Sequence, residues 1–217
     1  MSEMDPIAQL VSETFATNPR LPTKAEEESW DFRNQKRMRM DHLLEDALLP
    51  KHHTKNRVSK PEGDWGAAFE KLKGMMGSGF LVALIGIRGN GKTQLGVQLI
   101  QERCRHLRSG RYCTAVEFFM DLRSAYKKDG PSESEVMARY RNPSLLVIDE
   151  IGRRGETEWE NNVLYELLNR RHADDSDTVV ISNQDAAALE ESLGTSLVSR
   201  MRERGGLFEC NWASFRK

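Results

Sequence analysis

Residues 80–93 read Phe-Leu-Val-Ala-Leu-Ile-Gly-Ile-Arg-Gly-Asn-Gly-Lys-Thr. The first six are apolar without interruption, which is typical of a strand buried on both faces of a parallel sheet. The last eight match the pattern G-x-x-x-x-G-K-[ST], whose backbone N–H groups and lysine bind nucleotide phosphates. An amphipathic segment follows directly, so the pattern stands between a buried strand and a helix. This context favours a nucleotide site over a chance glycine-rich turn.

Each residue type in this loop has a role in phosphate binding. Glycines permit positive φ angles and bring backbone N–H groups close to phosphate oxygens, and the following helix points the positive end of its dipole at the same anion. Lys92 can reach the β- and γ-phosphates, and the Thr93 hydroxyl can bind Mg²⁺. The residues predicted to bind ATP or ADP here are Gly86, Gly89, Asn90, Gly91, Lys92, Thr93 and Gln94.

The rest of the chain after this loop alternates helix-like and strand-like segments. Further strands are predicted at residues 112–116, 145–148, 178–182 and 207–212. Helices are predicted at residues 94–107, 117–128 and 157–171. This alternation indicates an α/β fold with a parallel five-stranded sheet flanked by helices.

Two acidic residues end the third predicted strand. Residues 145–150 read Leu-Leu-Val-Ile-Asp-Glu, which places Asp149 and Glu150 at the sheet edge where open α/β folds bind ligands. Asp149 would complete the Mg²⁺ site with Thr93, and Glu150 would orient and deprotonate an attacking water. The alternative is a pair of acids favoured by the dipole at a helix N-terminus.

Polar residues near the end of the chain extend the candidate site. Asn183 follows the fourth predicted strand and could hydrogen-bond the γ-phosphate or the water, although asparagine is also a common turn residue. Arg200, Arg202 and Arg204 form a basic run. One of them could stabilise charge on the γ-phosphate of a neighbouring subunit, whereas a run of this kind is also typical of a solvated helix face.

The composition excludes several classes of protein. A net charge of -1 over 217 residues excludes a globally basic nucleic-acid coat. Cys104, Cys113 and Cys210 lack the spacing of a zinc site or a disulfide framework, so we expect reduced thiols. The polar first residues and the absence of a long apolar run predict a cytoplasmic protein without membrane association.

Residues 1–60 differ from the rest because they contain charge blocks and prolines but no strand-like run. We expect a short helical extension and linker at 1–60 and an ATPase domain at 61–217. Apolar residues in the extension could dock on a partner or pack against the ATPase domain, and these residues are Trp30, Phe32, Met38, Met40 and Leu43.

Several motifs together resemble the family of DnaC-like replicative helicase loaders and their IstB-like relatives. They are Leu-Leu-Val-Ile-Asp-Glu-Ile-Gly at 145–152, Arg170-Arg171, Ile181-Ser182-Asn183, Ser199-Arg200-Met201-Arg202 and Asn-Trp-Ala-Ser-Phe-Arg at 211–216. The resemblance implies an AAA+ fold. Because the chain stops just after the fifth predicted strand, we expect no C-terminal helical lid.

The resemblance also implies roles for individual residues. Lys92 and Thr93 match the P-loop pair, and Asp149 and Glu150 match the metal-binding and water-activating residues. Asn183 matches the first sensor, Arg200 the arginine finger acting in trans, and Arg216 a second, sensor-like arginine. The implied activity is Mg²⁺-dependent ATP hydrolysis, stimulated by oligomerisation or DNA.

For a loader, single-stranded DNA would thread a homo-oligomer lined by the segment after the second strand. That segment mixes aromatic residues with positive charge, at Phe118, Phe119, Tyr126, Lys127 and Lys128. The alternative is a core-facing phenylalanine pair beside surface lysines.

The leading hypothesis from the sequence is a compact, phage-type loader that binds a hexameric DnaB-like replicative helicase through its amino-terminal extension. A transposition regulator of the IstB type, acting on duplex DNA with a transposase, is the alternative, but its longer helical amino terminus is not matched here. A small-molecule kinase is disfavoured by Asp149-Glu150 and the Arg200 motif. A module that binds ATP without turnover is disfavoured by Glu150.

Overall fold

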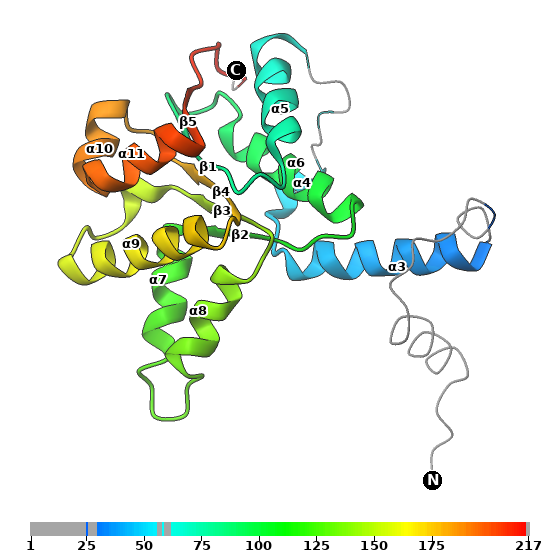
Figure 1. Ribbon diagram of the computed structural model, residues 1–217, viewed down its shortest axis with the longest axis horizontal. Helices are drawn as coiled ribbons and strands as arrows, with labels where there is room; N and C mark the ends of the chain where they lie inside the picture. The colour runs from blue at the N-terminus through cyan, green and yellow to red at the C-terminus, as the bar shows by residue number, and fades with distance from the viewer. Residues whose placement is uncertain (1–24, 26–29, 56–57, 59–61, 216–217) are drawn as a thin grey trace. The chain divides into compact units, whose positions relative to one another are not determined.

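The computed structural model describes residue 25 and residues 30–55, 58 and 62–215 (Figure 1). The chain divides into two compact units, residues 1–38 and residues 39–217. Helix α3 (Trp30–Asp46) crosses this division, and every strand among the described residues lies in the second unit. The second unit thus begins earlier than residue 61, where we expected the ATPase domain to begin. The assignment of residues 1–60 to a helicase contact remains a prediction.

The second unit is built on one five-stranded sheet in which all pairings are parallel. Its strands lie in the order β2-β3-β4-β1-β5, which confirms the predicted five-stranded parallel sheet. They are β1 (Leu81–Ile85), β2 (Gly110–Thr114), β3 (Leu145–Asp149), β4 (Asp177–Ile181) and β5 (Gly205–Glu209).

Helices connect the strands and cover both faces of the sheet (Figure 1). They are α4 (Lys51–Lys55), α5 (Gly63–Met75), α6 (Lys92–Arg105), α7 (Ala115–Ser124), α8 (Glu133–Arg141), the 3-10 helix η1 (Ile151–Arg153), α9 (Glu158–Ala173), α10 (Ala186–Leu193) and α11 (Thr195–Arg204). Helices α5 and α6 pack on one face, whereas α7 to α11 pack on the other. Successive side chains of β1, β3 and β4 point to opposite faces of the sheet, and they are buried on both faces.

Local signals explain two of the differences from the sequence prediction, while α8, α10 and α11 are further helices that we did not predict. The second strand ends at Thr114, not residue 116, because Thr114 and Glu117 form a capping box that starts α7. Helix α5 lies in a segment for which we predicted no helix. Its buried Trp65, Phe69 and Leu72 follow helical spacing, and this apolar stripe outweighs the neighbouring glycines.

The apolar residues near the amino terminus of the second unit pack on its own core. Met40, Leu43 and Leu44 are partly buried against the cluster that includes Trp65 and Phe80. The backbone carbonyl of Ala47, just after α3, accepts a hydrogen bond of 2.9 Å from the amide of Tyr112 on the edge strand β2. For Met40 and Leu43, two of the five residues for which both alternatives were open, the packing alternative is therefore confirmed. Among the described residues, no helix has both the length and the apolar character needed to cross a membrane.

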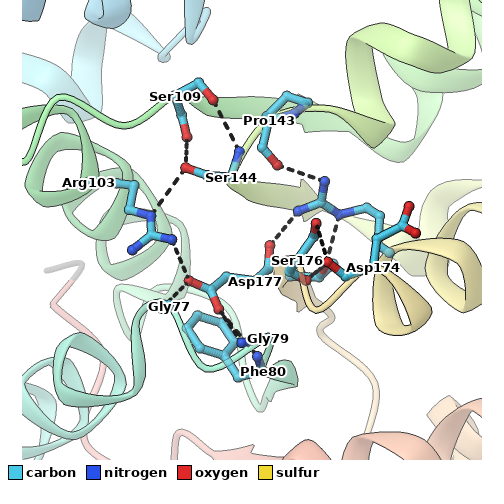
Figure 2. Close-up of polar contacts among 12 residues, drawn as sticks. Gly77, Gly79, Phe80, Arg103, Ser109, Pro143, Ser144, Asp174, Ser176 and Asp177 are labelled. Carbon is cyan, nitrogen blue, oxygen red and sulfur yellow. Dashed lines mark hydrogen bonds and ion pairs between the residues drawn. The ribbon is translucent and has the colours of Figure 1, made fainter. Parts of the chain in front are cut away.

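Asp177 anchors the amino-terminal edge of the sheet (Figure 2). Its buried carboxylate accepts hydrogen bonds from the amides of Gly77, Gly79 and Phe80, at 2.6, 3.0 and 3.3 Å. Arg103 on α6 pairs with the same carboxylate at 3.1 Å. Burial raises the pKa of Asp177, while these donors oppose the rise. Asp177 thus connects the residues that precede β1 to β4 and α6.

Arg171 on α9 is fully buried beside this anchor. Its guanidinium donates to the carbonyls of Arg141, Pro143 and Asp177, at 2.7, 2.8 and 2.5 Å, and to the Thr178 hydroxyl at 2.9 Å. Burial lowers the pKa of Arg171, nearby acidic groups partly oppose this change, and the resulting pKa is about 10. The arginine therefore serves as a fixed set of donors that joins the end of α8 to β4.

Replacing Arg171 by methionine is expected to lower the free energy of unfolding by about 3–5 kcal/mol, because several buried carbonyls lose their donors at once. Urea unfolding followed by circular dichroism measures this change. The matched control is Arg170→Met, since Arg170 is half-exposed and pairs with Asp174 at 3.4 Å. We expect the control to cost less than about 1 kcal/mol. Equal losses in the two variants would contradict the structural role of Arg171.

Candidate functional site

The glycine-rich loop joins β1 to α6 at the carboxyl edge of the sheet. Gly86, Gly89 and Gly91 have φ angles of 131°, 90° and 80°, a region that disfavours any residue with a Cβ atom. Gly91 is the N-cap of α6 and provides no side-chain cap. The first-turn N–H groups of α6 therefore stay available to an anion. This geometry fits nucleotide phosphates.

Lys92 folds back over its own loop. Its Nζ donates to the carbonyls of Gly86 and Ile87, both at 2.6 Å, and to the Asn90 side-chain oxygen at 3.1 Å. Only 4% of Lys92 is exposed, and burial lowers its pKa while Cys210 and Asp149 oppose the change. The ammonium is thus held against the loop that the sequence pattern predicts to bind phosphate.

Asp149 lies directly beside Thr93. One carboxylate oxygen accepts from the Thr93 hydroxyl at 2.6 Å and from the Tyr112 hydroxyl at 3.0 Å, while the other accepts from the Glu150 amide at 2.6 Å. Burial raises the pKa of Asp149, and these hydrogen bonds oppose the rise. Tyr112 reaches the site from the neighbouring strand β2, and no motif in the sequence pointed to it.

These oxygens suit a hard divalent cation. Mg²⁺ prefers carboxylate and hydroxyl oxygens together with phosphate oxygens and water, and Thr93 and Asp149 supply the first two beside the phosphate loop. The donor set therefore fits the Mg²⁺ that the sequence predicted. Such an ion would neutralise negative charge on the phosphates during hydrolysis.

Glu150 has a strained backbone. Its φ and ψ are 54° and 42°, in the left-handed region that non-glycine residues rarely adopt and that costs about 1–3 kcal/mol. Its carboxylate forms an ion pair of 3.2 Å with Arg153 in η1. Leu48, Leu107, Glu156 and Asp175 share this positive φ, so the strain alone does not mark a site. Glu150 is distinguished because it lines the same cavity as Lys92.

The cavity at this edge has a volume of about 710 Å³, within the range typical of small-molecule sites. It brings together most residues that the sequence predicted, and its lining includes Gly89, Asn90, Gly91, Lys92, Thr93, Gln94, Asp149, Glu150 and Asn183. Arg88 and Arg153 also line it, and the sequence prediction missed both. Phosphate loop, acidic pair and Asn183 thus share one space.

Part of the cavity wall comes from upstream in the chain. The Gln94 amide group pairs with His53 twice, through the His53 carbonyl and ring, each at 3.0 Å. One turn further along α6, Gln98 binds both the amide and the carbonyl of Val58, at 2.9 and 3.1 Å. His53 and Val58 line the cavity. Gln94 therefore shapes this wall, and its predicted contact with nucleotide remains a prediction.

Arg200 does not line this cavity. Its guanidinium lies over the Tyr165 ring, 5.6 Å from the centroid, and donates to the Tyr165 hydroxyl at 3.2 Å. This contact lowers the pKa of Tyr165. Arg216, the other predicted arginine, lies outside the residues that the structure describes.

The segment predicted to contact DNA is divided between core and surface. Phe118 and Phe119 are 0% and 1% exposed and pack with Tyr140 and Trp159, so the core-facing alternative is confirmed for this pair. Tyr126, in contrast, is 61% exposed.

The sequence of this chain is similar to that of known ATP-binding proteins. The family model described as IstB-like ATP binding protein matches residues 8–217. The replicative helicase loader DnaC of Escherichia coli (strain K12) is 27% identical over 129 residues, covering 59% of this chain and 53% of that protein. The chain thus spans about half the length of the curated relatives it matches.

Solved structures share the fold. The crystal structure of the DnaC helicase loader has a TM-score of 0.64 at 17% identity, covering 74% of this chain and 99% of that one. AMPPCP-bound DnaA from Aquifex aeolicus has a TM-score of 0.61 at 22% identity, covering 75% of this chain and 51% of that one. These likenesses confirm the predicted AAA+-like arrangement.

Proposed function

Because the chain belongs to the family of IstB-like ATP-binding proteins, we propose that it is an ATPase that loads a hexameric replicative helicase onto single-stranded DNA. The observation that carries this proposal is the single cavity that joins the phosphate loop, Asp149, Glu150 and Asn183. The similarity to the replicative helicase loader DnaC supports the choice of partner.

The proposed reaction is hydrolysis of the γ-phosphate of ATP. The oxygen of a water attacks the γ-phosphorus, the bond to the β-phosphate oxygen breaks, and Glu150 accepts the proton of the water. Lys92 and the loop N–H groups bind the phosphates, and Asn183 orients the water or the γ-phosphate. The products are ADP and inorganic phosphate.

Arg200 would act on the nucleotide of an adjacent subunit in a homo-oligomer. The position of Arg200 supports this proposal, because Arg200 lies against Tyr165 on α9 and does not line the cavity of its own subunit. Tyr165 is 37% exposed, so the pair stands at the surface where a second copy of the chain could meet it. The trans arrangement makes hydrolysis depend on assembly.

The DNA surface would be the outer side of α7 and the turn after it. Met120 and Tyr126 are 62% and 61% exposed, and Lys127 and Lys128 are exposed beside them. A base can stack on the Tyr126 ring while the lysines neutralise phosphates. Phe118 and Phe119 take no part, because they are buried.

Changing Lys127 and Lys128 to glutamate is expected to weaken binding of a single-stranded oligonucleotide. The slope of the logarithm of the binding constant against the logarithm of the salt concentration should become less steep by about 1.4, the value for two lost phosphate contacts. Fluorescence anisotropy at several salt concentrations measures both quantities. Lys71→Glu is the matched control, since Lys71 is an exposed lysine on α5 across the sheet. An unchanged slope in the double variant would remove this surface from the proposal.

The helicase contact is proposed for the first compact unit, residues 1–38. The division of the structure decides how to test it. Removing residues 1–60 would also delete His53 and Val58, which line the cavity and bind Gln94 and Gln98. A variant that begins at Arg39 keeps the second unit whole.

The test mixes the full chain, or residues 39–217, with the replicative helicase of its host, with and without ATP. Size-exclusion chromatography with light scattering should show a complex with the full chain that is lost on truncation. Nucleotide binding by both proteins, measured in parallel, controls for folding. No complex under either condition would reject helicase loading, and a transposase, as for the IstB-type alternative, would then be the partner to test.

A further inference from the structure

Three consecutive carbonyls of the phosphate loop accept hydrogen bonds from residues outside it. The Phe215 amide donates to the Gly89 carbonyl at 2.9 Å. The indole N–H groups of Trp212 and Trp65 donate to the carbonyls of Asn90 and Gly91, at 2.5 and 3.1 Å. One tryptophan precedes β1 and the other follows β5, so segments on either side of the sheet in sequence meet at this loop.

These contacts determine where the loop points its N–H groups. The peptide unit is planar and trans, so the carbonyl of one residue and the N–H of the next point in opposite directions. Holding the carbonyls of Gly89, Asn90 and Gly91 outward therefore directs the N–H groups of Asn90, Gly91 and Lys92 the other way. Those are the groups that a phosphate-binding loop offers to its anion.

Asn90 connects the same contacts to the lysine. It is fully buried, its side-chain nitrogen donates to the Cys210 carbonyl, and its side-chain oxygen accepts from Lys92 Nζ at 3.1 Å. The segment after β5 thus reaches Lys92 through one side chain. The sequence pattern leaves this position variable, so its role comes from the structure.

Gly91 shows how closely the aromatic residues approach. A Cβ atom there would lie 2.9 Å from the Trp65 indole nitrogen and 3.1 Å from the Phe215 ring. Trp65 is 4% exposed and stacks on Phe69, with ring centroids 5.9 Å apart. The Trp65 donor is therefore rigidly placed by α5.

We infer that Trp65 and Trp212 are positioning residues for nucleotide phosphates, acting through the carbonyls of the loop. This inference rests on the proposed nucleotide site. Each Trp→Phe change removes one N–H donor while keeping an aromatic ring. Each change should weaken ADP binding by about threefold to tenfold, the value of one neutral hydrogen bond, and the double change should weaken it more. KM for ATP should rise likewise, with kcat within about twofold of the wild type.

Isothermal titration with ADP, together with steady-state ATP hydrolysis, tests this. Trp159→Phe is the matched control, because Trp159 packs on Phe119 in the other layer of the fold. If the wild type binds ADP and Trp65→Phe and Trp212→Phe bind it equally well, the inference is wrong and the proposed ATPase stands. Failure of the wild type to bind ADP would reject the nucleotide site and the inference with it.

A backbone variant keeps the test valid if a tryptophan change prevents folding. Phe215→Pro removes the amide hydrogen that the Gly89 carbonyl accepts, whereas Phe215→Ala keeps it. Phe215 is 65% exposed, so neither change disturbs the core. We expect the proline variant to bind ADP about threefold to tenfold more weakly than the alanine variant. Equal affinities would contradict a positioning role for this contact.

Discussion

Replacing Lys92 by alanine is expected to raise the dissociation constant for ATP by at least about a hundredfold. Lys92 is 4% exposed and its ammonium lies against the loop carbonyls, so its bonds to phosphate would form largely away from bulk water. Charge-assisted hydrogen bonds of this kind are each worth about 1.5–3 kcal/mol, and two of them account for the expected loss.

Thermal unfolding with increasing ATP provides the measurement, because a ligand that binds only the folded state raises the melting temperature. The wild type should be stabilised and Lys92→Ala should not. Lys73→Ala is the matched control, since Lys73 lies on α5 and pairs with Glu70 at 2.6 Å. Equal stabilisation of Lys92→Ala and the wild type would show that nucleotide binds elsewhere.

Replacing Arg200 by alanine is expected to leave ATP affinity within about twofold of the wild type and to slow hydrolysis by about a thousandfold or more, the effect typical of arginine fingers. Affinity and hydrolysis should respond differently because Arg200 lies against Tyr165 and does not line the nucleotide cavity of its own subunit. Arg202→Ala is the control, as Arg202 belongs to the same helix but pairs with Glu190 at 2.8 Å.

Mixing two inactive variants determines whether Arg200 acts between subunits. Arg200→Ala keeps an intact nucleotide site, whereas Lys92→Ala keeps an intact finger. A mixed oligomer should therefore recover part of the hydrolysis that each variant lacks alone. Normal hydrolysis by Arg200→Ala would show that it is not the finger, and loss without recovery on mixing would argue against action in trans.

The nucleotide loop could be predicted because its chemistry is local. The apolar run at 80–85, the glycines and Lys92 are consecutive, and the fold needs them in this order. Asp149 and Glu150 were equally visible, since a strand that ends in carboxylates places them at the ligand edge whatever surrounds the sheet. Periodicity likewise indicated the parallel five-stranded sheet, because burial on both faces leaves uninterrupted apolar runs.

Contacts between distant segments could not be predicted in this way. Tyr112 meets Asp149 because β2 pairs with β3, and the inward direction of Phe118 and Phe119 depends on where Thr114 starts α7. Spacing alone left both orientations of the phenylalanine pair open. Only packing decided which one occurs.

The sequence by itself determined the chemistry of the loop, and the tertiary structure decided how that loop is held. The indole of Trp212 donates to the carbonyl of Asn90, a residue 122 positions earlier in the chain. No local pattern specifies such a bond, because it requires the segment after β5 to lie beside the loop after β1, which the pairing of β5 with β1 brings about. Hydrogen bonds between segments far apart in sequence exist only once the sheet has brought them together.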